Sequence, residues 1–519
     1  MLVIVIDVLR LLLYNAQAAW EIVSTPYYLR TPLVNSVVVC AASALLSTLI
    51  GVGLAWLLAR RSFPGKNVAL TLAIGPYVMP SFALAAGWII LWTRNGFFEK
   101  LTGLTSPVNP YGPLSLILIL GIHNYPLVLL NVYNALLNLD PSLEEASRIH
   151  GVSPLKTAMS VTLPLVTPAV LSGFILSFAY SISEFGAPAA LGMPVGYNVM
   201  TTAIYSFMYT APVNYEAAEL LSLTLTVFGT SLLVLNAIIL RRRKYTVITG
   251  KAARYEAPSR RLYPLALLAV LLALIYLPLA SLVFASFIKN IGKPITLDNI
   301  GFDNYIHVLS MRRTSASLQA SLIASVTAAF AATALGFLVA YSYVRYPGAL
   351  GKALDFLVFL PFSIPGLVIG VGLIIAGGKV YPSLYGTMLI LILAYIVRFL
   401  PYASRTISSV ILQIDESLEE SARIHGVPFT RVLEKIVLPL TKGALFSGWV
   451  LVFNSSMKEL SASAILSLQV ETALVTAYMM FSEGFFGDGT ALTSIVMFTT
   501  LLVTALASKM TKKSIVEMA

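Results

Sequence analysis

Long apolar windows separated by short polar segments run through most of this chain. Each window is roughly 20 residues long, the length at which an α-helix crosses a bilayer core of about 30 Å. Eleven such windows stand out, at 33–58, 68–92, 114–137, 166–190, 217–240, 262–287, 318–344, 354–376, 384–411, 440–466 and 491–508. The pattern predicts an all-α, polytopic membrane protein.

A further apolar stretch at 2–13 is short and carries Asp7 and Arg10, whereas the window at 262–287 carries no charge. We interpret 2–13 as a partial or imperfect first span. A signal peptide is the alternative, although charge lies inside the apolar run and no small-residue cleavage site stands out. The prediction is therefore 11 to 12 transmembrane helices.

One polar segment occurs twice. Residues 140–173 read DPSLEEASRIHGVSPLKTAMSVTLPLVTPAVLSG, and residues 415–448 read DESLEESARIHGVPFTRVLEKIVLPLTKGALFSG. The two copies align without a gap, and an even number of predicted spans separates them, so both face the same compartment. This arrangement indicates two parallel repeats of about six spans each.

The duplication covers nearly the whole chain, because other landmarks recur around the repeated segment. Phe63-Pro64-Gly65, for example, has a counterpart in Tyr346-Pro347-Gly348. The predicted organisation is a first half at 1–243, a basic cytoplasmic linker at 244–261 and a second half at 262–519.

Basic residues indicate the orientation. The net charge of +11 would suggest a nucleic-acid partner in a soluble protein, but a chain that is 58% hydrophobic with a mean hydropathy of +0.84 belongs in a membrane. If the repeated segments are cytoplasmic, most of the 34 Lys and Arg residues lie on that side, as in other membrane proteins. We therefore interpret the basic linker as a topology determinant at the lipid surface and expect no nucleic-acid partner.

Each repeated segment predicts a short polar helix, a turn and a second helix. Asp140 and Asp415 are suitable caps for the first helix, and Gly151 and Gly426 stand where a left-handed residue ends it. Such a helix buries little apolar surface against lipid. It is better suited to a protein partner at the membrane surface.

The spacing of charged and small residues in both copies resembles the EAA loop of ABC importer permeases, although Ser147 and Ser421 each replace one Ala. The residues that carry the resemblance are Glu145, Ala146, Ser147, Gly151, Leu163, Pro164, Glu420, Ser421, Ala422, Gly426, Leu438 and Pro439. Pro164 and Pro439 are also predicted to break the helix before the next span.

The resemblance implies that each loop forms a coupling helix, which docks into a groove on an ATP-hydrolysing subunit. Glu145 and Glu420 would make polar docking contacts, Ala146 and Ser421 would allow close approach, and the glycines would shape the turn. The chain would then be the fused transmembrane subunit of a type I ABC importer. The alternative is that these residues only cap and end loops between spans.

The expected partners are two ABC ATPase subunits on the cytoplasmic side, an extracytoplasmic solute-binding protein and the lipid bilayer. No Gly-x-x-x-x-Gly-Lys-Ser/Thr motif occurs in the sequence. We therefore expect no catalytic residue and no cofactor in this chain, with ATP and Mg bound by the partner subunits. The four His residues lack ligand spacing and Cys40 is the only cysteine, so no metal site is predicted.

Ionisable residues inside spans usually mark a transport path or a charged partner. Glu184 and the pair Lys458-Glu459 occupy matching places in the span after each repeated segment, which makes them candidates for the translocation path. A structural Lys to Glu pair is the alternative. Arg398 and Asp355 are interpreted as anchors at the ends of spans.

Within the family, SEFGAPAALG at 183–192 and KELSAS at 458–463 resemble the fused iron(III) importer permeases, although Ser461 stands where that family usually has Pro. Iron(III) is therefore the predicted solute. Thiamine, phosphonate, polyamine or an inorganic anion are alternatives. A secondary transporter or a channel is less favoured, because intramembrane carboxylates are few and neither class needs duplicated cytosolic docking helices.

Overall fold

The computed structural model describes residues 20–22, 24–242, 257–258, 263–346, 348–380, 382–384, 386–467 and 469–511. Its regular structure is helical apart from two paired strands of two residues each, β1 (Arg61–Ser62) and β2 (Ala257–Pro258). The predicted first span at 2–13 and most of the predicted linker at 244–261 lie outside the described residues.

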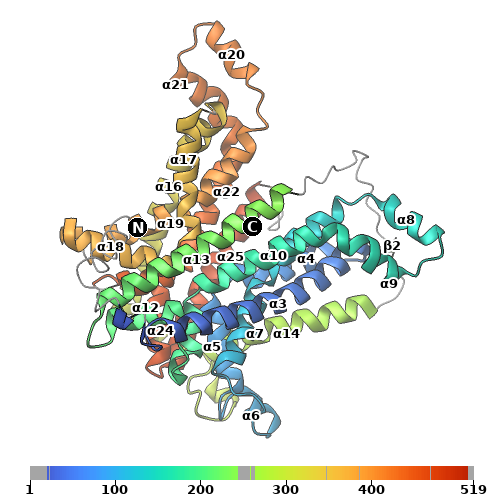
Figure 1. The fold of residues 1–519 in the computed structure, drawn as a ribbon. Coiled ribbons are helices and arrows are strands. Elements are labelled where there is room, and N and C mark those ends of the chain that lie inside the picture. The colour runs from blue at the N-terminus through green and yellow to red at the C-terminus, as the bar shows by residue number, and fades with distance from the viewer. Residues whose placement is uncertain are drawn as a thin grey trace. The chain divides into compact units, whose positions relative to one another are not determined.

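The chain divides into two compact units, and among the described residues the boundary falls between Ile300 and Gly301. The first unit contains α3 (Arg30–Arg60), α4 (Lys66–Val78), α5 (Ser81–Trp92), α6 (Phe97–Thr102), α7 (Pro113–Leu137), α8 (Pro141–Ile149), α9 (Pro154–Thr157), η1 (Ala158–Thr162), α10 (Leu163–Ser183), α11 (Gly186–Leu191), η2 (Met193–Val195), α12 (Met200–Tyr209), α13 (Tyr215–Arg242), α14 (Tyr263–Ser286) and η3 (Leu297–Asn299) (Figure 1).

The second unit contains α15 (Asp303–Ser310), α16 (Arg312–Arg345), α17 (Ala349–Phe359), η4 (Leu360–Ser363), α18 (Gly366–Val380), η5 (Pro382–Leu384), α19 (Met388–Ile411), α20 (Ser417–Ile424), α21 (Phe429–Val432), η6 (Leu433–Val437), α22 (Leu438–Met457), α23 (Ser461–Leu466), α24 (Ala473–Ser482) and α25 (Phe486–Thr511).

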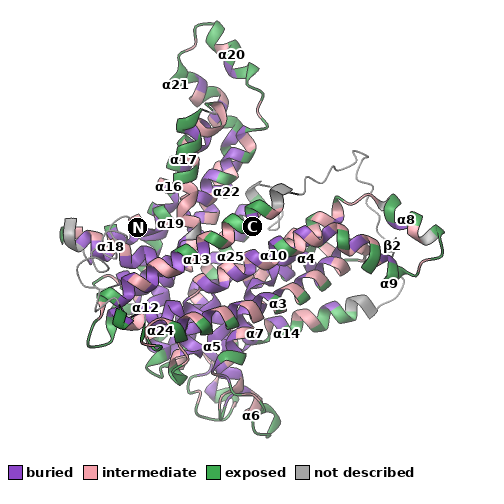
Figure 2. Cartoon of the chain, viewed as in Figure 1, coloured by how far each residue is buried: buried purple, intermediate pink, exposed green. Residues whose placement is uncertain are grey.

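Among the described residues, nine helices are long and apolar enough to cross a membrane, and two bent helix pairs raise the number to eleven if each pair counts as one span. They fall on the predicted apolar windows, so the prediction of an all-α polytopic membrane protein is confirmed. The windows at 68–92 and 354–376 are the bent pairs, with bends of 92° and 106°. Figure 2 shows exposed residues concentrated at the ends of the helix bundles and buried residues along the packed spans.

A proline inside α4 leaves one carbonyl without its helical partner, and two tyrosines donate to the carbonyls at this place. Pro76 has no N–H for the carbonyl of Leu72, one turn earlier. The hydroxyl of Tyr276 donates to the Leu72 carbonyl at 2.8 Å, and the hydroxyl of Tyr125 donates to the Ala73 carbonyl at 2.6 Å. Because water is absent from the bilayer core, such partners are needed for a broken span to be stable.

Glycines allow close packing of three helices around the repeated segment. In the first unit, a Cβ on Gly51 of α3 would lie 2.7 Å from Val128 Cβ of α7, and one on Gly173 of α10 would lie 2.8 Å from Val128 Cα. Small residues of this kind let helix backbones approach in a membrane. The equivalent residues of the second unit are Gly336, Ala403 and Gly448.

The predicted break at Pro164 and Pro439 is wrong. Helical structure continues through both prolines, over Pro154–Ser183 and Phe429–Met457. In each case one π-helical turn, η1 or η6, ends just before the Leu-Pro dipeptide. The wider π turn accommodates the missing N–H and the ring of the proline, which would distort a regular α-helix.

The first compact unit extends past the predicted start of the second half. Helix α14 packs against α5, where a Cβ on Gly87 would lie 1.8 Å from the Pro278 carbonyl oxygen. The half boundaries at 243 and 262 concern the sequence repeat and stay a prediction.

Candidate functional site

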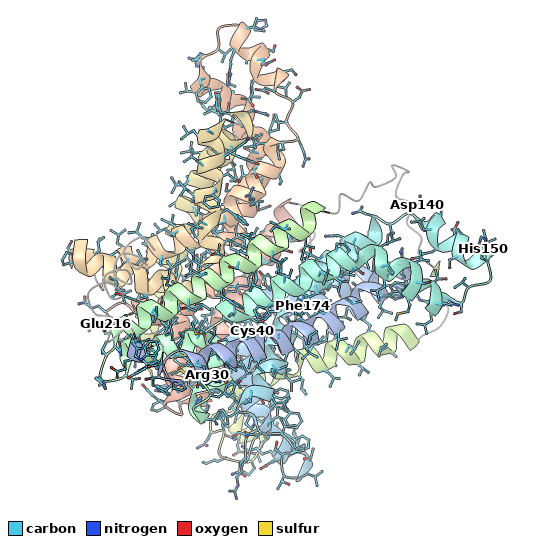
Figure 3. The ribbon with its side chains drawn as sticks, in the orientation of Figure 1. Arg30, Cys40, Asp140, His150, Phe174 and Glu216 are labelled. Carbon is cyan, nitrogen blue, oxygen red and sulfur yellow. The ribbon has the colours of Figure 1, made fainter. Side chains whose placement is uncertain are left out.

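The two copies of the repeated segment form short helices at the ends of their units. Helix α8 lies at the end of the first unit where α3 ends and α10 begins, and α20 lies where α16 ends and α22 begins (Figure 1). Figure 3 shows Asp140 and His150 at one end of the first unit and Arg30 and Glu216 at the other. The polar helix therefore lies on the side opposite to the start of α3.

Matching local contacts start the two helices. Asp140 Oδ1 accepts the backbone N–H of Ser142 at 2.9 Å, and Asp415 Oδ1 accepts that of Ser417 at 3.0 Å. These hydrogen bonds, first from the backbone N–H and then from the serine side chain, lower the pKa of both aspartates. Each aspartate therefore satisfies a free N–H group at the start of its helix.

The ends of the two helices also match. Gly151 and Gly426 have φ of +74° and +77°, which confirms the predicted left-handed residues. The next residue in each copy donates its N–H back into the helix, from Val152 to the Ser147 carbonyl and from Val427 to the Ala422 carbonyl. This pattern satisfies carbonyls that the end of the helix leaves free.

Adjacent glutamates in each copy have opposite environments. Glu144 and Glu419 are buried, at 7% and 1% exposure, whereas Glu145 and Glu420 are exposed. Neighbouring residues of an α-helix point about 100° apart, so one helix cannot bury both. The sequence motif indicates the exposed glutamates, Glu145 and Glu420, but gives no sign of the buried ones.

In the first unit, the buried carboxylate joins α8 to the end of α3. Arg60 Nη2 donates to Glu144 Oε1 at 2.6 Å, and Thr162 Oγ1 donates to the same oxygen at 2.9 Å. Arg60 is the last residue of α3. A residue at the end of a span therefore holds the surface helix through an ion pair.

In the second unit, the equivalent carboxylate joins α20 to the end of α16. Arg345 Nε donates to Glu419 Oε1 at 2.7 Å, and the Tyr341 hydroxyl donates to Oε2 at 2.6 Å. Arg345 Nη2 also donates to the Ile414 carbonyl at 3.0 Å, and Arg423 Nη2 lies 3.8 Å from Glu419 Oε2. The same ion pair thus recurs with more hydrogen bonds.

The outward faces of α8 and α20 combine a carboxylate with a large apolar side chain. Ile149 and Ile424 are each 83% exposed. They follow Glu145 and Glu420 by four residues, and residues at this spacing share a helix face. The identical Arg-Ile-His-Gly-Val run in both copies is the sequence signal that could have identified these isoleucines.

The remaining residues of the predicted motif fall into two groups. Near the exposed face, Ala146 and Ser421 are exposed, while the half-buried Ser147 hydroxyl lies 2.9 Å from Thr157 Oγ1, and Ala422 is half-buried. The Leu-Pro pairs instead begin the following span, after the π turn. These pairs are Leu163 with Pro164 and Leu438 with Pro439.

Glu184 lies at a helix break in the first unit. It follows the last residue of α10, and its backbone is extended at ψ 141°. Its Oε1 accepts a 2.5 Å hydrogen bond from Ser81 Oγ, and its carbonyl accepts one from Thr201 Oγ1 at 2.7 Å. Ser81 is the first residue of α5, directly after the bend that separates α4 from α5.

Glu459 occupies the matching break between α22 and α23, where it accepts the Ala462 N–H at 2.7 Å. Its Oε2 lies 3.4 Å from Arg398 Nε. Arg398 lies in the middle of α19. Its Nη1 packs so closely against Gly366, the first residue of α18, that a Cβ at Gly366 would lie 1.0 Å from this nitrogen. The interpretation of Arg398 as an end-of-span anchor is therefore wrong.

Both units thus place a carboxylate at the same kind of position. Each carboxylate follows the span after the repeated segment and lies beside the first residue of the second limb of a bent helix pair. Asp355, the other predicted anchor, lies in α17 and pairs with Arg405 at 3.1 Å.

The family model described as "Binding-protein-dependent transport system inner membrane component" matches residues 48–245 and 332–512. The two matched regions contain one copy each of the repeated segment and of the carboxylate at the helix break.

Two ferric transport permeases are similar to most of this chain. The "Ferric transport system permease protein FbpB" of Actinobacillus pleuropneumoniae is 27% identical over 483 residues, which cover 91% of this chain and 69% of that protein. The "Putative ferric transport system permease protein FbpB 1" of Haemophilus influenzae is 27% identical over 464 residues, covering 87% and 72%.

A shorter relative matches less than half of this chain. The "Molybdenum transport system permease protein ModB" of Haemophilus influenzae is 31% identical over 215 residues, which cover 40% of this chain but 93% of that protein. A protein of that size corresponds to one repeat of the present sequence.

Proposed function

Because the chain belongs to the family of binding-protein-dependent transport system inner membrane components, we propose that α8 and α20 couple this permease to two separate ATPase subunits. The chain is a multi-pass permease of the cell membrane. In the proposal, the chain forms the solute path, the linker at 244–261 joins its halves at 1–243 and 262–519 on the cytoplasmic side, and a solute-binding protein delivers the solute outside. ATP and Mg bind to the partner ATPases.

The observation that carries the proposal is the matching outward face of the two helices. In each copy a glutamate and an isoleucine, Glu145 with Ile149 and Glu420 with Ile424, are exposed one turn apart. The same large apolar side chain recurs at this exposed position in both copies, where it can serve as an anchor for a partner. A helix that presents anchors one turn apart fits a groove on a partner. The small exposed residues Ala146 and Ser421 leave room for close approach.

Charge reversal on the outward face tests the docking. We expect the double variant Glu145→Arg and Glu420→Arg to lose copurification with the ATPase and solute-stimulated ATP hydrolysis in proteoliposomes. The control is Glu434→Arg, since Glu434 is an exposed glutamate of η6 outside the two helices. If the double variant hydrolyses ATP in full coupling with uptake, the docking surface lies elsewhere.

We further propose that Glu184 and the pair Lys458-Glu459 contribute to the translocation path. Discontinuous membrane helices often form solute sites, because the break frees backbone polar groups and helix ends. A carboxylate at such a break is therefore a candidate for contact with the solute. The Arg398 pairing of Glu459 is compatible with a structural role as well.

The path assignment can be tested at Glu184. The variant Glu184→Gln keeps an acceptor for Ser81 but removes the charge, so we expect a changed apparent affinity for solute with ATPase binding retained. The control is Glu216→Gln, because Glu216 is exposed at the start of α13. An unchanged solute affinity and selectivity in Glu184→Gln would remove Glu184 from the path.

We propose iron(III) as the solute, because three relatives that extend over most of this chain are ferric transport permeases by name. The second candidate is an inorganic oxyanion, favoured by the similarity to a molybdenum permease. Uptake of radioactive iron by proteoliposomes that contain the complete transporter, with molybdate and sulfate as competitors, separates the two. Absence of iron uptake, together with uptake of labelled molybdate or sulfate, would exclude iron as the solute.

A further inference from the structure

We propose that Arg60 with Glu144, and Arg345 with Glu419, are positioning pairs, which hold each coupling helix at a fixed angle to the end of a long span. Through these pairs a movement of α8 or α20 is passed to α3 or α16 as well as to the spans on either side in the sequence. The inference rests on the proposed docking of ATPase subunits at α8 and α20.

The first argument is where the arginines lie. Helices α3 and α16, of 31 and 34 residues, are the longest described in their units, and Arg60 and Arg345 are their last residues. Each long helix packs against the spans before and after the surface helix, α7 with α10 or α19 with α22. The chain itself joins the surface helix to those two spans, so the ion pair adds a third attachment. A surface helix attached at two points can still rotate about the line between them, whereas a third attachment fixes its orientation.

The second argument is burial. The side chains of Arg60 and Glu144 are 10% and 9% exposed, and those of Arg345 and Glu419 are 8% and 1% exposed. A buried charge that loses its partner is strongly unfavourable. The surface helix therefore cannot tilt away from the long span without exposing or separating both charges, which favours joint movement.

The third argument is that the two adjacent glutamates of each helix have different environments. Glu144 and Glu419 point inward to the arginines, while Glu145 and Glu420 are exposed to solvent. Positioning and docking thus rest on different side chains of one helix. Variants of the two kinds should have different effects on the transporter.

The two pairs are not equally strong. Glu419 also accepts the Tyr341 hydroxyl, and Arg345 reaches the Ile414 carbonyl just before α20. In the first unit, by contrast, the buried Nε of Arg60 has no hydrogen-bond partner among the described residues. We expect loss of the carboxylate to have a larger effect in the second unit.

A spin label on the chain alone tests the pairs without any ATPase. In a Cys40→Ala background, a nitroxide at Ile149→Cys or Ile424→Cys reports the mobility of each surface helix in nanodiscs. We expect Glu144→Gln and Glu419→Gln to increase label mobility, and the exchange Arg60→Glu with Glu144→Arg to reverse the increase at position 149. The control is Glu434→Gln, which removes the exposed ion pair with Lys435.

The complete transporter, reconstituted with its ATPase and binding protein, gives the second readout. We expect the ATP hydrolysed per solute transported to rise in Glu144→Gln or Glu419→Gln, with ATPase copurification retained, and to fall again in the charge exchange. Unchanged label mobility together with unchanged coupling in both single variants would overturn the inference.

The two failures can be told apart. If the unmodified chain does not bind an ATPase, the proposed function fails, while the nitroxide result still decides whether the pairs hold the helices. If a single variant gives no monodisperse protein, the charge exchange decides, because it keeps both charges buried and paired. If the spin label is as mobile in the charge-exchange variant as in the single variants, the proposal is also contradicted.

Discussion

At the scale of single residues, the environment of a side chain separates two glutamates that the sequence presents as equivalent. Glu419 contacts Arg345 and Tyr341, whereas Glu420 faces solvent. Removal of a buried charge leaves the opposite charge of its partner buried and unpaired, which costs much stability. Removal of a charge that faces water changes stability little. The buried member of each Glu-Glu pair is therefore expected to determine stability, and the exposed member to affect partner binding.

This difference predicts the thermal stability of two neighbouring variants. Glu419→Gln should lower the free energy of unfolding by about 3 kcal/mol, because it leaves the buried Arg345 unpaired. Glu420→Gln should change it by no more than about 0.5 kcal/mol. Thermal unfolding of the purified chain in nanodiscs measures both values. Equal losses in the two variants would show that the Arg345 pair contributes no more than a surface charge.

At the scale of helices, close packing depends on particular glycines of α3. A Cβ on Gly51 would lie within 3 Å of α7, whereas Gly53, two residues further along the same helix, has no atom within 4 Å of its Cβ position. Both glycines look alike in the sequence. Only the arrangement of α3 against α7 separates them, because one faces the neighbouring helix and the other does not.

The two glycines form a matched pair of variants. Gly51→Ala should destabilise the first unit by about 2 kcal/mol, since the added methyl group forces α3 away from α7. Gly53→Ala should be neutral or slightly stabilising, because alanine has the higher helix propensity and meets no neighbour. Comparison of the two unfolding temperatures checks this. A loss of stability in Gly53→Ala as large as that in Gly51→Ala would contradict the packing argument.

At the scale of the whole molecule, the compact units and the sequence repeat divide the chain at different places. Helix α14 follows the predicted linker at 244–261 but packs in the first unit, against α5. The contact is tight, because α5 contributes Gly87 opposite the carbonyl of Pro278. A cut in the linker therefore leaves α14 on the second fragment and its packing surface on the first.

This arrangement predicts that fragments 1–250 and 251–519 copurify when they are expressed together. Gly87→Leu should weaken the association, since its Cβ would lie 1.8 Å from the Pro278 carbonyl oxygen, whereas Gly53→Leu should not. Affinity capture through a tag on either fragment measures the yield of the other. If Gly87→Leu leaves that yield unchanged, α14 does not hold the fragments together.

The sequence by itself determined the features that depend on local composition and spacing. Apolar length located the spans, because the cost of a polar residue in lipid is a property of the segment itself. The repeated segment could be aligned without structure, and Gly151 and Gly426 were identified as left-handed because the helix end needs that backbone conformation. The exposed Glu145 and Glu420 were chosen from the same pattern, and their docking role stays a prediction.

Tertiary structure alone decided which groups far apart in the chain meet. The pairing of Glu144 with Arg60, the contact of Arg398 with Glu459 and the tyrosine partners of the α4 carbonyls all join separate helices. Helical structure also continues through Pro164, where local preference indicates a break, because a π turn precedes the proline. Hydropathy fixes where a helix crosses the membrane. The direction in which each side chain points depends on the neighbours that packing supplies.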